Sequence, residues 1–188
     1  MRAMLTPNEV AALAGAPRTV VEKAIEQKVL IADRRARERV RQLPLHAVAV
    51  AATVKSLGRR LSIDDKRRVA QALAQLSPAD LKTAEIEVAP ALIVHVGRLS
   101  RSAVERAERY AAARDAHIET AEGVQGGRPV IRGTRITVSA IHGRLGAGDT
   151  IDDLVEDYPD VPREAFEAAF LYAETHPQVG RPPQERAA

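Results

Sequence analysis

With 188 residues, the chain has room for one ordinary domain or two small ones, and its 45% hydrophobic content predicts a folded protein. Cysteine is absent, which excludes disulfides, cysteine-ligated metal sites and a thiol nucleophile, and indicates a reduced, cytoplasmic setting. No apolar run is long enough to span a membrane and the N-terminus lacks a signal-peptide core, so we expect no membrane partner.

Charge is distributed unevenly along the chain around its net value of +3. Residues 1–60 hold 12 Lys and Arg against 5 Asp and Glu, whereas residues 116–188 hold 7 against 12. A basic beginning and an acidic end suggest two partners of opposite charge. The alternative is a chance segregation of solvated surface charge.

The first 30 residues predict two short helices separated by a turn. Thr6, Pro7 and Glu9 have the pattern of an N-terminal capping box, and Gly15 ends the first helix. Pro17 opens a second helix, whose apolar residues recur on one buried stripe. This arrangement is typical of the helix–turn–helix, in which outward residues of the second helix contact DNA bases. The candidates for base contacts are Arg18, Thr19 and Lys23.

A basic segment follows the second helix. Residues 29–31 predict a short strand, and five arginines lie within the next ten residues. A pair of strands with a basic tip would form a wing that rests on DNA phosphates, and the alternative is a solvated linker or helix surface. The candidates for phosphate contacts are Arg34, Arg35, Arg37, Arg39 and Arg41.

The rest of the chain predicts a connector and a second small domain. Residues 61–114 read as helices and short strands, which we expect to join the two ends or to mediate dimerisation. Beyond them, glycines surround two short strands and three helices follow. Phe166 and Phe170 lie four residues apart and predict the core-facing side of the last helix. Residues 178–188 are expected to form a disordered tail.

The sequence offers little for catalysis or metal binding. The five histidines are scattered, and no pair has the spacing of a helical zinc site. The aspartates between residues 149 and 160 lack the Gly and Glu of a calcium loop, and Gly126-Gly127-Arg128 lacks the Lys of a phosphate loop. We therefore expect no enzymatic activity, no metal and no cofactor.

Two segments resemble known families. The run Gly127-Arg128-Pro129-Val130-Ile131-Arg132-Gly133-Thr134-Arg135 and the helices after it, over residues 115–177, resemble the domain-of-unknown-function family 433. Members of that family are similar to VapB-type antitoxins, which pair with PIN-like ribonuclease toxins. Residues 4–42 resemble the winged helix–turn–helix of MerR-like and excisionase-like proteins. The chain has Gln27-Lys28-Val29-Leu30 where those proteins usually have Gly-Lys/Arg-Leu.

These resemblances imply a mainly α fold with a few short strands. We expect a winged helix–turn–helix in residues 1–60, the connector in 61–114, a three-helix domain in 115–177 and the tail. The implied function is an antitoxin that neutralises a PIN-like (VapC-type) ribonuclease and represses its own operon by binding operator DNA, as a homodimer or higher oligomer. The alternative is a stand-alone MerR-like transcriptional regulator.

The signature segment contains the candidates for toxin contacts. A glycine in its turn can take a positive φ, so that the flanking arginines point outward. The resemblance implies an acidic, metal-binding toxin site that would attract these arginines. The alternative is that they hold the acidic helices of their own domain. The candidates are Arg132, Gly133, Arg135 and, in the tail, Arg181.

Overall fold

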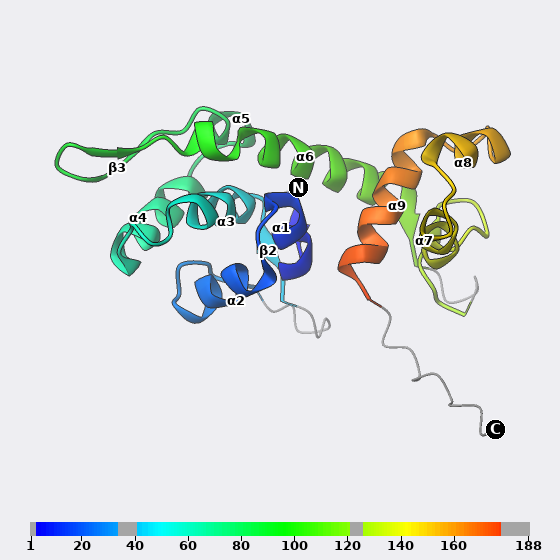
Figure 1. Cartoon of the computed structure of the whole chain (residues 1–188), viewed down its shortest axis with the longest axis horizontal. Helices are drawn as coiled ribbons and strands as arrows, with labels where there is room; N and C mark the ends of the chain where they lie inside the picture. The colour runs from blue at the N-terminus through cyan, green and yellow to red at the C-terminus, as the bar shows by residue number, and fades with distance from the viewer. Residues whose placement is uncertain (1–2, 34–40, 121–125, 178–188) are drawn as a thin grey trace, which may run out of the picture. The chain divides into compact units, whose positions relative to one another are not determined.

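A computed structural model describes residues 3–33, 41–120 and 126–177 of the chain (Figure 1). The chain divides into two compact units, residues 1–118 and 119–188. Over the described ranges the fold is mainly helical with a few short strands, as the sequence predicts; the structure has nine helices and three short two-stranded sheets there.

The first unit opens with a short strand and two helices, β1 (Met4–Leu5), α1 (Pro7–Ala14) and α2 (Arg18–Glu26). The expected capping box is confirmed, because the Thr6 hydroxyl accepts from the Glu9 N–H while the Glu9 carboxylate accepts from the Thr6 N–H. Gly15 ends α1 in the left-handed conformation, with φ of 59°. Val21 and Ala24 are buried on α2, which lies against α1 and α3.

The predicted strand at residues 29–31 is wrong. The N–H groups of Val29 and Leu30 both donate to the carbonyl of Ala24, which folds the chain back under the end of α2. Both side chains are buried, so the apolar run reflects packing in a turn rather than strand pairing. Lys28 permits the reversal by adopting φ of 55°, a left-handed conformation that costs a non-glycine residue free energy.

The chain then returns to β1. Asp33 and Gln42 form an antiparallel bridge with two hydrogen bonds of 2.8 and 2.9 Å. The following strand, β2 (Leu43–Pro44), pairs antiparallel with β1. Residues 31–33 and 41–42 are therefore the two sides of one arm, which we call the arm; Arg34, Arg35, Arg37 and Arg39 fall between them, outside the described residues.

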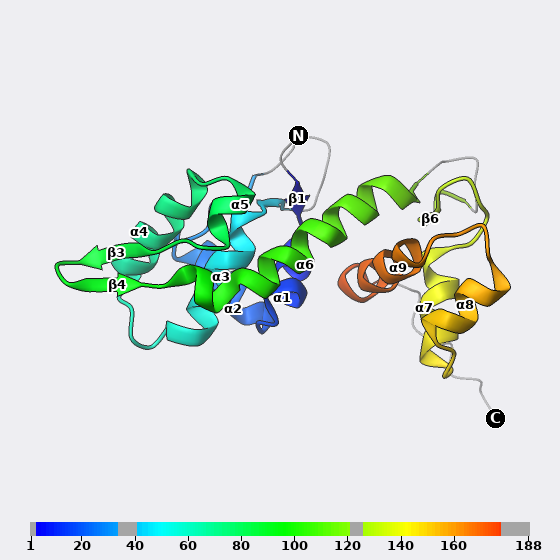
Figure 2. The ribbon, with the colours of Figure 1, turned by 90° about the horizontal axis from the view of Figure 1, so that it is seen from above.

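The central helix of the first unit is α3 (His46–Leu57), whose residues from Ala47 to Thr53 are all buried. The remaining elements of the unit are α4 (Ile63–Ala74), α5 (Pro78–Leu81), β3 (Ile86–Ala89), β4 (Leu92–Val94) and α6 (Val96–His117). α6 packs along α3, and the β3–β4 hairpin extends from the helices beside the start of α6 (Figure 2). Residues 61–114 thus belong to the same compact unit as residues 1–60.

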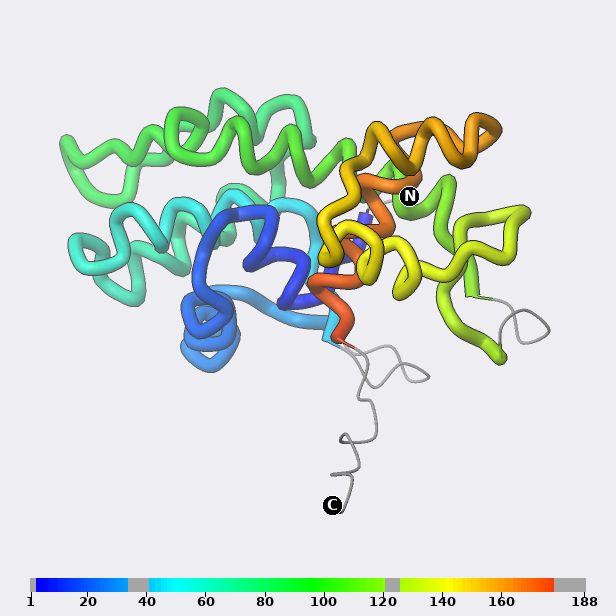
Figure 3. The backbone as a smooth tube through the Cα atoms, turned by 45° about the vertical axis from the view of Figure 1, so that its right-hand side comes forward, coloured from blue at the N-terminus to red at the C-terminus, as the bar shows by residue number. Residues whose placement is uncertain are grey.

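The second unit contains a short sheet and three helices. Its elements are β5 (Ile118–Glu119) at the boundary, β6 (Val130–Ile131), α7 (Val138–Gly146), α8 (Ile151–Asp157) and α9 (Arg163–Thr175). α9 packs against both α7 and α8, and it lies beside α7 in Figure 3. The core gathers Val130, Ile141, Leu154 and Phe166, which are all buried.

The prediction for the two phenylalanines is half confirmed. Phe166 is fully buried, but Phe170 is 39% exposed, so its assignment to the core is wrong. The Phe170 ring stacks on His142 of α7, with ring centroids 5.8 Å apart. Residues one helical turn apart are rotated by about 40°, and on a helix covered by only two short neighbours this rotation carries Phe170 to the edge of the contact.

Candidate functional site

The exposed face of α2 carries all three candidates for base contacts. Arg18, Thr19 and Lys23 are exposed, while the opposite side of the helix is anchored on the core of the first unit. Arg18 makes an ion pair with Glu22, with 2.7 Å between Nε and Oε1. Glu22 is one helical turn beyond Arg18, so its carboxylate lies on the same face of α2. Arg18 would have to break its ion pair with Glu22 before it could contact DNA.

A further cation, which the sequence analysis missed, lies beside the turn between α1 and α2. The Lys55 amine, from the last turn of α3, is 3.5 Å from the position a Cβ would take on Gly15. Thirty-seven residues separate Lys55 from Arg18, so only the packing of α3 under α1 and α2 brings the two segments together.

The C-terminal end of α2 is held by an arginine of α4. The guanidinium of Arg67 donates two hydrogen bonds, of 3.2 and 2.9 Å, to the carbonyl of Gln27. Since the last carbonyls of a helix lack partners within the helix, this contact caps α2 and fixes its orientation.

The arm lies next to α2. Arg41 is exposed on the returning side of the arm, directly before the Asp33–Gln42 bridge. The described part of the predicted wing is therefore an antiparallel arm that follows α2 and rejoins β1. The other four arginines of the basic run lie outside the described residues, so their phosphate contacts stay a prediction.

A buried network fixes α1 on α6. The Glu9 side chain is 1% exposed; it accepts a 2.6 Å hydrogen bond from the Tyr110 hydroxyl and a 3.0 Å bond from Arg114. Burial disfavours the charged form of Arg114, but the carboxylates of Glu9 and Asp115 outweigh burial and raise the pKa of Arg114 above its usual value. The network joins residues more than 100 positions apart and holds the helix that supports α2.

The signature segment forms a hairpin. The Ile131 N–H donates to Ile136 O and the Val138 N–H donates to Pro129 O, both at 2.9 Å. At the tip, Gly133 adopts φ of 74°, the conformation for which glycine is suited, and the space beside its Cα is open. We call residues 128–138 the signature hairpin.

The candidate arginines of the signature hairpin are both exposed. Arg132 Nε lies 3.8 Å from Glu119 Oε2, and the Gly133 N–H donates to the same carboxylate at 3.2 Å. Arg135 has no ion-pair partner among the residues that the structure describes, and Arg128, which the sequence analysis did not single out, is likewise exposed. Arg181 lies outside the described residues.

Comparison with known proteins assigns this unit to a family. Residues 118–173 match the family model described as "Protein of unknown function (DUF433)". This segment is a DUF433 domain. The uncharacterized protein y4eO of Sinorhizobium fredii (strain NBRC 101917 / NGR234) is 36% identical over 81 residues, which are 43% of this chain and 36% of that protein. The match thus spans about a third of the relative's length. No solved structure matches the chain.

Within the DUF433 domain, the acidic helices are held by other arginines than those of the signature hairpin. Arg144 pairs with Asp149 at 2.5 Å and with Asp157 at 2.7 Å, and Arg163 pairs with Asp152. The hydrogen bonds that Arg144 donates to the carboxylates of Asp149 and Asp157 raise the pKa of Arg144 above its usual value. The signature hairpin contacts the carboxylate of the strand residue Glu119 through Arg132 and Gly133.

The described residues contain no cluster of His, Asp and Glu that could hold a metal ion. Across the same residues, no helix is both long and apolar enough to cross a membrane.

Proposed function

We propose that the protein is an antitoxin whose first unit binds operator DNA and whose DUF433 domain neutralises a PIN-like (VapC-type) ribonuclease. The observation that carries the DNA-binding half is the order β1, α1, α2, arm and β2, with α2 exposed beside the arm. This order supports a winged helix–turn–helix, a motif in which the second helix enters the major groove and the wing follows the backbone.

In this proposal Arg18, Thr19 and Lys23 contact base edges from α2. Arg41 and the four arginines before it contact phosphates, and Lys55 adds a phosphate contact beside the turn. Operators of dimeric helix–turn–helix proteins are usually inverted repeats with half-sites about one helical turn apart, so a homodimer is the expected binding form.

The toxin-binding half rests on the signature hairpin. An acidic nuclease site attracts guanidinium groups, and the resemblance to antitoxin families implies such a partner. The backbone hydrogen bonds of the signature hairpin already order its tip, so Arg132 and Arg135 lose less conformational entropy on binding than residues of a flexible tail.

DNA binding is tested with the full chain and a fragment of its own promoter, by fluorescence anisotropy. Arg18→Ala should reduce the preference for promoter over scrambled DNA by about tenfold, because a bidentate base contact contributes about 1–3 kcal/mol. Arg41→Ala should weaken both DNAs alike and make the dependence of affinity on salt shallower. Arg98→Ala, at an exposed arginine of α6, is the control. Unchanged binding by both test variants refutes the assignment.

Toxin neutralisation is tested by co-expressing the chain with the product of the adjacent gene and measuring ribonuclease activity of the purified complex. The full chain should suppress the activity, and Arg135→Glu should restore it, because like charges then face each other. Arg98→Glu should leave the suppression intact. If the adjacent product neither binds the chain nor cleaves RNA while promoter binding persists, the protein is a stand-alone MerR-like regulator.

That alternative is favoured by one observation. Every element that we assign to DNA binding lies in the first unit, which has its own core, so DNA binding requires no contribution from the DUF433 domain.

A further inference from the structure

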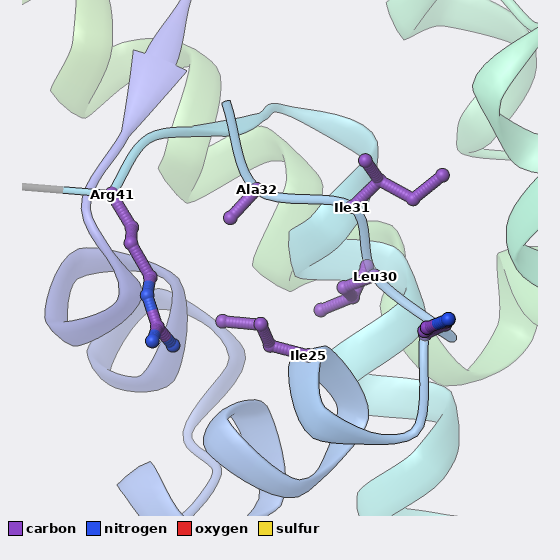
Figure 4. Close-up of a pocket in the computed structure, with 6 residues that line it drawn as sticks. Ile25, Leu30, Ile31, Ala32 and Arg41 are labelled. Atoms are coloured by element: carbon purple, nitrogen blue, oxygen red, sulfur yellow. The ribbon is translucent and has the colours of Figure 1, made fainter. Parts of the chain in front are cut away.

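A pocket opens between the end of α2 and the arm (Figure 4). Its volume is about 420 Å³, which lies in the range typical of sites for small organic molecules. It is lined by Ile25, Lys28, Leu30, Ile31, Ala32 and Arg41, and we call it the α2–arm pocket.

The wall of the α2–arm pocket is apolar. Leu30 is buried, Ile25 and Ala32 are half-buried, and Ile31 is 83% exposed, the largest exposed fraction among the large apolar residues of the described chain. A large apolar side chain held in water beside an apolar concavity gains free energy when a ligand covers both.

The charges of the α2–arm pocket have one sign. Two of its six lining residues are cations and none is acidic. In Figure 4 the Arg41 side chain reaches from the arm toward Ile25 of α2. Neither Lys28 nor Arg41 makes an ion pair with any residue the structure describes, so no carboxylate of the described residues competes with an anion there.

We propose that the α2–arm pocket binds a small organic anion with an apolar body, of the class of aromatic or short-chain carboxylates and sulfonates. The apolar part of the ligand covers Ile25, Leu30 and Ile31, and its anionic group pairs with Arg41 or Lys28. Apolar walls with a few placed polar groups are the usual composition of such sites.

Because of the position of the pocket, we expect a bound ligand to change DNA binding; this expectation rests on the proposed DNA-binding function. One residue of the pocket, Arg41, is also among the residues that we assign to DNA phosphates. A bound anion neutralises Arg41, so it weakens the affinity for phosphates and makes promoter binding dependent on the ligand.

The test uses the full chain without DNA and the fluorescent probe 1-anilinonaphthalene-8-sulfonate, which has an aromatic body and one sulfonate. Ala32→Phe, which fills the pocket, and Arg41→Glu, which reverses the charge, should each weaken probe binding by about tenfold or more, while Arg41→Lys should retain most of it. Arg98→Glu and Ile93→Ser are controls, because Ile93 belongs to the exposed apolar surface of the β3–β4 hairpin. Circular dichroism of each variant checks that it is folded.

Two results overturn the proposal. In the first, the parent chain, Ala32→Phe and Arg41→Glu bind the probe with equal affinity, and the parent chain binds the uncharged N-phenyl-1-naphthylamine as tightly as the probe. The other is loss of binding in Ile93→Ser, which would assign the probe to the hairpin. Because the titration contains no DNA, a chain that fails the promoter assay can still pass this test, and the two failures are distinguishable.

Discussion

At the scale of single residues, Glu9 has two roles, of which only one can be predicted from the sequence. Its part in the α1 capping box is predictable, because both partners lie within four residues. Its burial and its bonds to Tyr110 and Arg114 are not, because they depend on the packing of α6, about 100 residues later. Phe170 shows the same limit, since periodicity predicts a helix face but does not say how far the neighbouring helices cover it.

Glu9→Ala should lower the free energy of unfolding of the first unit by about 1–3 kcal/mol, because it removes the buried carboxylate to which the Tyr110 hydroxyl and the Arg114 guanidinium donate. Glu22→Ala removes an exposed ion pair with Arg18 and should cost about 1 kcal/mol or less. Urea unfolding followed by circular dichroism measures both. Equal losses in the two variants would contradict the buried network.

At the scale of elements, local signals predict the ends of helices better than they predict strands. The Thr6 cap is found where the sequence places it, and Ser62 and Thr150 form the same kind of capping box at the starts of α4 and α8. The strand at residues 29–31 is wrong because a short apolar run is equally suited to a buried turn. Of the two short strands expected among the glycines, one is β6 and the other is reduced to a single bridge between Thr137 and Val130.

The capping box of α8 predicts a dependence of stability on pH. The backbone N–H and then the hydroxyl of Thr150 lower the pKa of Asp153 below its unfolded value of 3.8. The stabilisation is therefore complete above pH 3.8 and is lost as the pH falls through the lower pKa of the folded state. Asp153→Asn should flatten this part of a pH titration of unfolding, whereas Asp160→Asn, at an exposed position, should not. Identical profiles for the two variants would contradict the cap.

At the scale of the whole molecule, the two units have separate cores and opposite tasks in our proposal. The sequence predicts this division through the change in charge along the chain, and the signature motif places the DUF433 domain. It does not show that residues 61–114 pack with the DNA-binding elements, because the long α3–α6 contact joins apolar faces that are far apart in sequence.

Phe166→Ala should destabilise the DUF433 domain by about 3–5 kcal/mol, the usual cost of emptying a buried aromatic site. Hydrogen exchange should then be faster in α7, α8 and α9, while the amides of α3 keep their protection. Phe170→Ala, on the exposed ring, should cost much less. Faster exchange throughout α3 in the Phe166 variant would show that the two units unfold as one.

At Lys28, the residue that would make the left-handed turn most stable differs from the residue that the proposed ligand site needs. A search for thermostable variants would favour glycine at this position, because glycine adopts φ of 55° without the steric penalty of a side chain. The same replacement deletes one of the two cations that line the α2–arm pocket. Selection for robustness alone would therefore remove a binding determinant without disturbing the fold, and a stabilised variant of this chain would be a poor starting point for finding its natural ligand.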